Sequence, residues 1–297
     1  MKLSTLKTCE QLIGSNDLAA LGAELRQVIK AEDKPDWIKY LGRLHTFVLV
    51  LECGQTPTAP FSIYGESNDK LGDDFLTYSQ LIGGDHCPGA GECLDYCYSK
   101  KAHRYPAAWC RQAQNAILAR SDTGRALLVT ALDNKLLERK YKELDQVTFR
   151  LFVDGDFIST QAVLFWMDVL RDRPRLSCYG YSKSFNELLA AGVVLDIQDK
   201  QWPDNYILNV SDGHRHSPGM VKSIESLPIT RGRFVTVKMP YKVQSKMHAD
   251  RDHQAQLRDV YGAKAFTCPG KCGDCTPKGH ACGSSRFNDV DIIIAVH

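Results

Sequence analysis

The chain has 297 residues, of which 43% are hydrophobic and 24% charged, and its formal net charge is +2. This composition argues against disorder and supplies enough apolar material for a sizeable core. It lacks the clustered basic charge of a nucleic-acid-binding protein, a secretory signal and any apolar run of about 20 residues, so we expect a cytoplasmic protein that does not enter a membrane.

Residues 1–60 are predicted to form an N-terminal extension. Within residues 11–30, Leu18, Leu21 and Leu25 recur at helical spacing, which predicts an amphipathic helix. The run HTFVLVLE (45–52) is apolar and is followed by the loop signal GQTPTAP, so we expect a strand there. The extension is therefore predicted to be mixed helix and strand.

Residues 61–297 are predicted to form one α/β domain, because short apolar runs alternate with helical stretches. The predicted strands are 74–81, 146–153, 176–181, 206–210, 233–238 and 291–296. The predicted helices are 105–120, 123–142, 161–171, 184–191, 217–226 and 248–261. This alternation favours βαβ units, and six of them predict a partial (βα)6 barrel of the TIM type.

Polar side chains follow the predicted strands. In βα barrels and open α/β sheets the active site forms where the carboxyl ends of the strands meet. We expect catalytic roles at this edge for Asp154, Asp156, Lys183 and His297. We expect cofactor-binding roles for Ser182, Ser211 and Asp212.

Simpler interpretations of the same residues stay open. Asp156 is also well placed to cap the following helix, because aspartate accepts hydrogen bonds from free backbone N–H groups there. Lys183 is equally compatible with a solvated lysine, and His297 with a hydrogen-bonded core histidine.

Eleven cysteines are an odd number, which argues against full disulfide pairing. In a reducing compartment, closely spaced cysteines are more often metal ligands. The first cluster is Cys87, Cys93 and Cys97, in a loop whose glycines let the backbone wrap around a metal. Three ligands leave one coordination position open for a substrate or cofactor. Cys110, in a predicted helix, is assigned to packing.

The second cluster comprises Cys268, Cys272, Cys275 and Cys282. Four thiolates satisfy either a tetrahedral zinc ion or a four-iron cluster, so the ligands alone do not choose the metal. A zinc-stapled loop is the structural alternative, and disulfides are a weaker one. The lone Cys9, Cys53 and Cys178 are predicted to be small buried apolar residues.

A three-cysteine loop directly after the first strand resembles the layout of radical S-adenosylmethionine enzymes. VDGDF (153–157) stands where those enzymes carry an acidic, glycine-rich motif. The resemblance implies a [4Fe–4S] cluster and S-adenosylmethionine as cofactors. The spacing typical of that family, C-x3-C-x2-C, occurs here only in the second cluster.

An ordered set of segments resembles a phage-associated family called gene product 88. They are CPGAGECLDYCYSKKAHRYP, FRLFVDGDFIS, YGYSKSF, NVSDG, CPGKCGDC and the closing strand that ends in His297. The resemblance covers about residues 61–297 and implies a phage or prophage protein, located in the host cytoplasm, but it supplies no reaction.

The main hypothesis is an iron–sulfur enzyme with redox or radical chemistry on an unidentified small molecule. Its first cysteine cluster would be catalytic and its second would hold an auxiliary cluster or share ligands. The alternatives are a zinc-stabilised, non-enzymatic protein that binds a host protein or nucleic acid, and an electron carrier without a substrate pocket.

Overall fold

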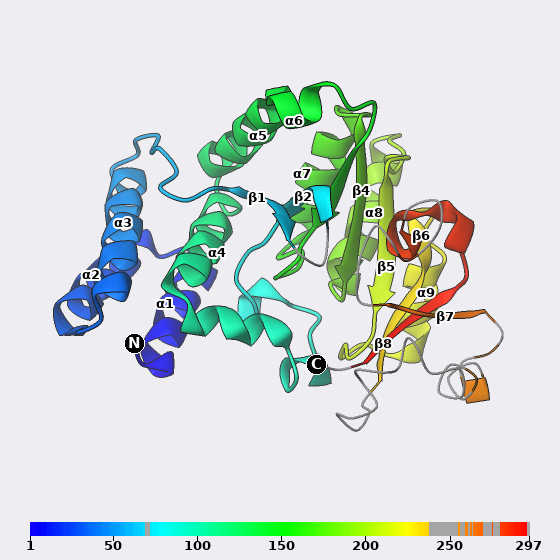
Figure 1. Cartoon of the computed structure of the whole chain (residues 1–297), viewed down its shortest axis with the longest axis horizontal. Coiled ribbons are helices and arrows are strands. Elements are labelled where there is room, and N and C mark those ends of the chain that lie inside the picture. The colour runs from blue at the N-terminus through cyan, green and yellow to red at the C-terminus, as the bar shows by residue number, and fades with distance from the viewer. Residues whose placement is uncertain are drawn as a thin grey trace.

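The computed structural model describes residues 1–68, 72–237, 255, 259–260, 262, 264–269, 275 and 280–295. At the N-terminus three helices pack side by side (Figure 1). They are α1 (Leu3–Gly14), α2 (Leu18–Ala31) and α3 (Pro35–Glu52). The helix expected over 11–30 is divided between α1 and α2, because Asn16 adopts a left-handed φ of 57° and Asp17 caps α2 through the Ala20 N–H.

The strand predicted at 45–52 is wrong, since these residues form the second half of α3. Proline at the first position of α3 suits a helix start. Trp37, Leu41, Leu44 and Val48 are buried at intervals of three or four residues, so the apolar run continues a helical face that begins upstream. Packing of that face outweighs the strand preference of the valines. The described part of the extension is thus helical.

In the described part of the chain, eight strands form one sheet in the order β1-β2-β3-β4-β5-β6-β8-β7. Their bounds are β1 (Tyr64–Asn68), β2 (Gly72–Tyr78), β3 (Val147–Leu151), β4 (Leu176–Ser182), β5 (Tyr206–Ser211), β6 (Thr230–Val237), β7 (Ala265–Thr267) and β8 (Asp291–Ala295). Every pairing is parallel except that of β1 with β2. The six predicted strands therefore lie side by side in chain order, and the mixed α/β class is confirmed.

Helices connect the parallel strands. They are α4 (Pro106–Leu118), α5 (Asp122–Leu137), α6 (Arg139–Lys142), α7 (Thr160–Arg171), α8 (Phe185–Ile197) and α9 (Pro218–Glu225). The side chains of Ser121, Ser159 and Ser217 cap α5, α7 and α9 by accepting backbone N–H bonds, which is why these helices begin where they do. These helices confirm the predictions between 105 and 226. The helix predicted at 248–261 lies largely outside the described residues.

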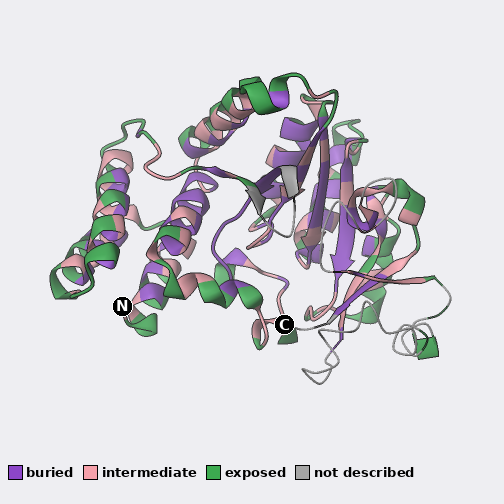
Figure 2. Ribbon diagram, viewed as in Figure 1, coloured by how far each residue is buried: buried purple, intermediate pink, exposed green. Residues whose placement is uncertain are grey.

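The two faces of the sheet are covered differently (Figure 2). Buried residues such as Phe149, Cys178 and Leu208 belong to the main core, which extends through the connecting helices to α1–α3. The alternate residues, including Tyr179 and Ile292, pack instead in a smaller core with residues from the segment 266–287. Helices thus cover one face, and the C-terminal cysteine-bearing segment covers the other. Among the described helices, none is long and apolar enough to cross a membrane.

Candidate functional site

A cysteine-bearing segment lies over the carboxyl edge of the sheet, between β2 and α4. We call residues 83–97 the rim loop. It contains two short 3₁₀ turns, Gly84–His86 and Glu92–Leu94. The loop pairs with the segment after β5, because the N–H groups of Gly91 and Cys93 both donate to the Gly213 carbonyl at 3.0 and 3.1 Å. The backbone therefore holds the cysteines in register with the end of β5.

Two glycines permit this close approach. A Cβ atom on Gly89 would collide with the backbone carbonyl of Lys183, just beyond β4. Gly213 has a left-handed φ of 68°, and a Cβ there would come within 2.8 Å of the Cys93 Cβ. Larger residues at either position would push the rim loop away from the strand ends.

The three thiols of the rim loop share one electrostatic environment. Burial raises the pKa of Cys87, and the charges of Asp156 and Cys97 raise it further. Burial also raises the pKa of Cys93, whereas the Lys183 ammonium lowers it. Cys97 is therefore close enough to influence both Cys87 and Cys93, and Lys183 supplies a compensating positive charge.

The two aspartates after β3 are both engaged by internal donors. Asp156 is only 4% exposed, and its carboxylate accepts bonds from the Ser182 hydroxyl and from the backbone N–H groups of Phe157 and Lys183, at 2.7 to 2.8 Å. Burial raises the pKa of Asp156, and these bonds oppose the rise. The bond from Phe157, the first residue after Asp156, is a local turn and not the predicted helix cap, because Ser159 caps α7.

Asp154 anchors the segment after the rim loop. Its carboxylate accepts hydrogen bonds from the Ser99 hydroxyl and, at 2.9 Å, from the Gln112 side-chain amide. Its position ties β3 to the 3₁₀ helix Tyr98–Arg104 and to α4. Both aspartates thus lie at the predicted edge, where they fix backbone segments in place.

Lys183, Ser211 and Asp212 lie at the ends of β4 and β5. The Lys183 Nζ donates to the Ser211 hydroxyl at 2.6 Å, so this lysine is not simply solvated. Asp212 accepts bonds from the Thr236 N–H and hydroxyl, both at 2.6 Å, which links β5 to β6. The structure therefore brings these residues together with the rim loop, as predicted for the carboxyl edge.

A brace from the N-terminal helices supports the rim loop from behind. The Glu10 carboxylate on α1 accepts hydrogen bonds from His103 Nε2 and Trp109 Nε1, each at 2.8 Å. His86, which precedes Cys87, contacts the Glu10 carbonyl through Nε2 at 3.0 Å and accepts from Arg120 through Nδ1 at 3.1 Å. Burial and the Arg120 charge lower the pKa of His86 to about 4, so its ring is neutral.

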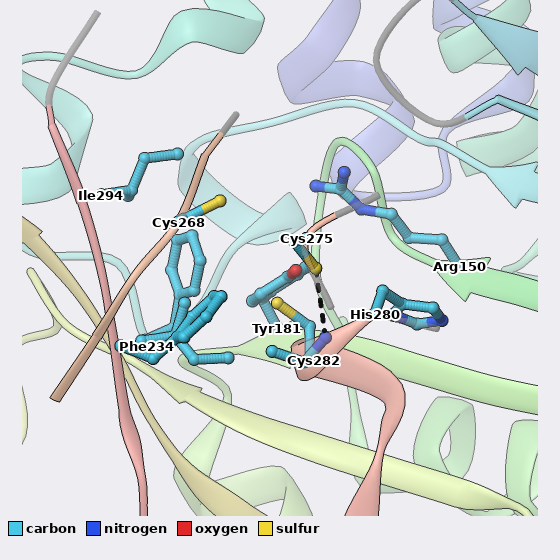
Figure 3. Close-up of a pocket in the computed structure, with 11 residues that line it drawn as sticks. Arg150, Tyr181, Phe234, Cys268, Cys275, His280, Cys282 and Ile294 are labelled. Atoms are coloured by element: carbon cyan, nitrogen blue, oxygen red, sulfur yellow. Dashed lines mark hydrogen bonds between the residues drawn. The ribbon is translucent and has the colours of Figure 1, made fainter. Parts of the chain in front are cut away.

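A second set of thiols lines a small cavity on the sheet face that the helices do not cover (Figure 3). We call it the inner pocket, and its volume is about 30 Å³. It is lined by Arg150, Tyr181, Phe234, Phe266, Cys268, Cys275, His280, Ala281, Cys282, Ile292 and Ile294. Cys268, Cys275 and Cys282, which come from separate segments, line the same space.

The polar groups around the inner pocket make hydrogen bonds and ring contacts with neighbouring residues. The Arg150 guanidinium lies over the Tyr181 ring, with its Cζ atom 5.0 Å from the ring centroid, and extends toward the thiols (Figure 3). Cys275 Sγ accepts a hydrogen bond from the Ala281 N–H at 3.3 Å, and the Cys282 carbonyl accepts from the Asn209 side chain at 2.9 Å. Burial and the Arg150 charge lower the pKa of His280 to about 4.

The inner pocket lies one layer of side chains below the rim. Asn209 and Ser211 are two residues apart on β5 and face the same side of the sheet, and Lys183, whose Nζ bonds to Ser211, comes two residues after Tyr181 and directly follows β4. Two residues of strand span roughly 7 Å. Arg150 lines the inner pocket, and its charge also acts to lower the pKa of Tyr98, beside Cys97.

Among the described residues, no group of three or more His, Cys, Asp or Glu side chains is arranged closely enough to hold a metal ion. The predicted ligand Cys272 and the predicted catalytic His297 lie outside the described residues. Cys9, Cys110 and Cys178 are buried in the core as predicted, but Cys53 is exposed after the last turn of α3, so its assignment to the interior is wrong. It follows a helix end, and no neighbouring element covers it.

Sequence reasoning missed the lining of the inner pocket, above all Arg150 and His280. Arg150 stands between Phe149 and Leu151, where strand alternation alone places it on the face opposite the main core. A basic residue at that alternate position was the available signal. His280 and Ala281 directly precede Cys282, but their spacing resembles no common ligand pattern.

The family model for gene product 88 matches residues 64–290, which include the cysteines of both sites and strands β1 to β7. The chain belongs to the gene product 88 family. The recognition of this phage-associated family from its motifs is thereby confirmed. No curated protein and no solved structure matches the chain.

The match to gene product 88 begins at β1 and excludes α1–α3. The family region therefore contains the rim loop, while the Glu10 brace that supports the loop comes from outside that region. Membership groups the protein by its sheet and cysteine pattern, and the chemistry must be argued from the sites.

Proposed function

We propose that the chain is an iron–sulfur protein in which Cys87, Cys93 and Cys97 hold a cluster at the carboxyl edge of the sheet. Its function would be redox or radical-type chemistry on a small molecule. The observation that carries the proposal is the gathering of three thiols from one loop above the ends of β2 to β5. In α/β proteins this edge is where ligands and active sites are found.

The donor set fits such a cluster chemically. Thiolates are soft ligands that favour iron–sulfur clusters and zinc over hard cations. Three protein thiolates leave one iron of a four-iron cluster without a protein ligand, and a substrate or cofactor would bind there.

Lys183 would compensate the charge of this centre. Three thiolates on a [4Fe–4S]²⁺ core carry a net charge of minus one, and a cation beside the sulfurs stabilises such an anion. With Ser211, the lysine would also bind the carboxylate or phosphate of a substrate that lies across the edge.

The aspartates would act as positioning residues. Asp154 and Asp156 already accept internal hydrogen bonds, so they hold the ends of β3 and β4 at fixed positions beside the rim loop. Ser182 and Asp212 serve the same purpose for β4 and β5. This places the chemistry on the cluster and on Lys183, and not on a carboxylate pair.

The order of the six parallel strands supports the predicted partial barrel, in which consecutive βα units place their loops at one end. Radical S-adenosylmethionine enzymes, whose layout the sequence resembles, hold their cluster on such a loop after the first strand. S-adenosylmethionine is therefore a proposed cofactor, which a reduced cluster would cleave. Release of 5′-deoxyadenosine under reducing conditions tests this point, and its absence from fully reconstituted protein would remove the cofactor from the proposal.

The experiment that tests the cluster is anaerobic purification with iron, sulfide, visible and electron-paramagnetic analysis. We expect a brown protein with iron and sulfide in near-equal amounts, about four of each per chain at the rim. The triple variant C87S/C93S/C97S should lose this iron, whereas C53S, which changes an exposed lone cysteine, should keep it. Colourless wild-type protein after reconstitution would contradict the proposal.

A second candidate is a zinc-stabilised protein that binds a host protein or nucleic acid without catalysis. The observation that favours it is that Asp154, Asp156 and Asp212 are all occupied as hydrogen-bond acceptors within the protein. It predicts zinc at the rim, no visible absorption band, and unfolding by chelators. The same metal analysis separates the two candidates.

A further inference from the structure

The inner pocket differs from the rim in being enclosed and mainly apolar. Beside its three thiols it is lined by Phe234, Phe266, Ile292 and Ile294, and Cys268 and Cys282 are both buried. The thiols come from three separate points of the chain: the end of β7, the single described position 275, and the 3₁₀ turn Ala281–Gly283. Their convergence on one cavity requires an explanation beyond packing.

The size of the cavity limits what it can hold. A cavity needs about 10–15 Å³ to hold one water molecule. The inner pocket, at about 30 Å³, therefore accommodates one ion with one small ligand. A cube of four irons and four sulfides does not fit in that space. The auxiliary iron–sulfur cluster expected from the sequence is therefore disfavoured here, and a single ion is favoured.

Charge and donor type specify the ion. Three thiolates and a divalent cation carry a net charge of minus one, and the Arg150 guanidinium on the pocket wall neutralises it. Sulfur donors in a closed, apolar setting are typical of structural zinc, which binds thiolates at about 2.3 Å in tetrahedral geometry. The fourth position belongs to a further donor or to water. The His280 ring is directed away from the thiols and packs at a tilt against the Tyr179 ring, with 4.5 Å between the ring centroids.

We propose that Cys268, Cys275 and Cys282 bind one thiophilic divalent ion, zinc in the cell, at the inner pocket. Among the residues that the structure describes, no three donors stand at coordination distance, so the bound form would need the thiols to rotate toward one another. The site is independent of the rim cluster and goes beyond the proposed function. Its role is structural, because the ion joins the segment after β7 to the turn that covers β4 and β5.

The test is metal analysis of the full chain after purification with zinc and iron both supplied. We expect about one zinc per chain in the wild type and in C87S/C93S/C97S. The triple variant C268S/C275S/C282S should lose at least nine-tenths of that zinc and keep the rim iron. C110S, which changes a buried cysteine of α4, is the matched control and should retain both metals.

A second measurement avoids reliance on variants that fail to fold. Metal-depleted wild-type protein is titrated with Co²⁺ and with Cd²⁺ alone, and we expect a thiolate-to-metal charge-transfer band that saturates at one equivalent. Peptide mapping after alkylation should show Cys268, Cys275 and Cys282 protected at least tenfold by zinc.

Three results would overturn the proposal. They are unchanged alkylation with and without zinc, retention of zinc by C268S/C275S/C282S, and loss of iron in place of zinc from that variant. A rim without iron would defeat the proposed function but leave the zinc result intact, so the two failures are distinguishable.

Discussion

Cys93 at the rim and Cys282 in the inner pocket carry the same thiol in different surroundings. Cys93 belongs to a half-exposed loop whose backbone bonds to Gly213, and the Lys183 ammonium acts to lower its pKa. Cys282 is buried among aromatic and aliphatic side chains and has Arg150 on the opposite wall. An open polar setting admits a cofactor and a substrate, whereas a closed apolar one retains an ion. The surroundings, more than the ligand, separate a reactive centre from a structural one.

The largest expected effect concerns the contact between the rim loop and the end of β4. Gly89→Ala places a methyl group against the Lys183 carbonyl, which the backbone cannot relieve locally, so we expect a loss of about 3 kcal/mol in the free energy of unfolding. Gly42→Ala is the matched control, because nothing lies near that position in α3, and it should be neutral or stabilising by up to about 1 kcal/mol. Denaturant unfolding measures both, and equal effects would refute the close contact.

The next effect concerns the carboxylate below the rim loop. Asp156→Asn directs an amide N–H₂ group toward a backbone N–H group that cannot turn away. We expect a loss of about 2–3 kcal/mol in the free energy of unfolding. Asp154→Asn should cost less, because its donors are a rotatable hydroxyl and a side-chain amide. Thermal unfolding of the two variants compares them, and a larger loss for Asp154→Asn would contradict the assignment.

A smaller effect concerns the zinc affinity of the inner pocket. Arg150→Met keeps the length of the side chain but removes the charge that offsets the thiolates, so zinc affinity should fall about tenfold, or about 1.4 kcal/mol. Arg150→Lys should retain most of the affinity. Competition with a chromophoric chelator gives both constants. An unchanged affinity in Arg150→Met would show that the guanidinium does not balance the site.

The smallest effect depends on pH and concerns the brace behind the rim. The Glu10 carboxylate raises the pKa of His103, so the charged pair stabilises the fold fully below the unfolded value of about 6.5. That stabilisation is lost as the pH rises through the folded pKa. His103→Gln should therefore lower the free energy of unfolding by about 1 kcal/mol near pH 6 and by progressively less in alkaline buffer, as measured by denaturant unfolding at each pH. A difference that is constant with pH would exclude the ion pair.

Much of the sheet was predictable because its physical signals are local. β3, β4 and β5 are short apolar runs bounded by polar residues, and their burial follows the expected alternation or continuous apolar pattern. β1 and β7 were missed because they are short edge strands with little apolar content, such as YGESN. The helix α3 was misread at its end because its valines favour strands, and only the upstream residues from Trp37 onward reveal the continuous face.

The candidate site was predictable in position but not in detail. Strand order alone places Asp154, Lys183 and Ser211 at one edge. The use of Asp156 as an acceptor for three donors depends on how β4 ends relative to β3, which no local pattern specifies. The inner pocket depends on residues about 130 apart in the chain, Arg150 and Cys282, and is visible only after folding.

Glu10 has a practical consequence for anyone who shortens the chain. A fragment cut to the family boundaries, residues 64–290, lacks the acceptor for His103 and Trp109 and the carbonyl that orients His86. It also uncovers the Trp109 ring, which rests on Trp37 of α3. Crystallisation and spectroscopy should therefore start from residues 1–297, since a version trimmed to residues 64–290 would loosen the support on which the first cysteine cluster depends.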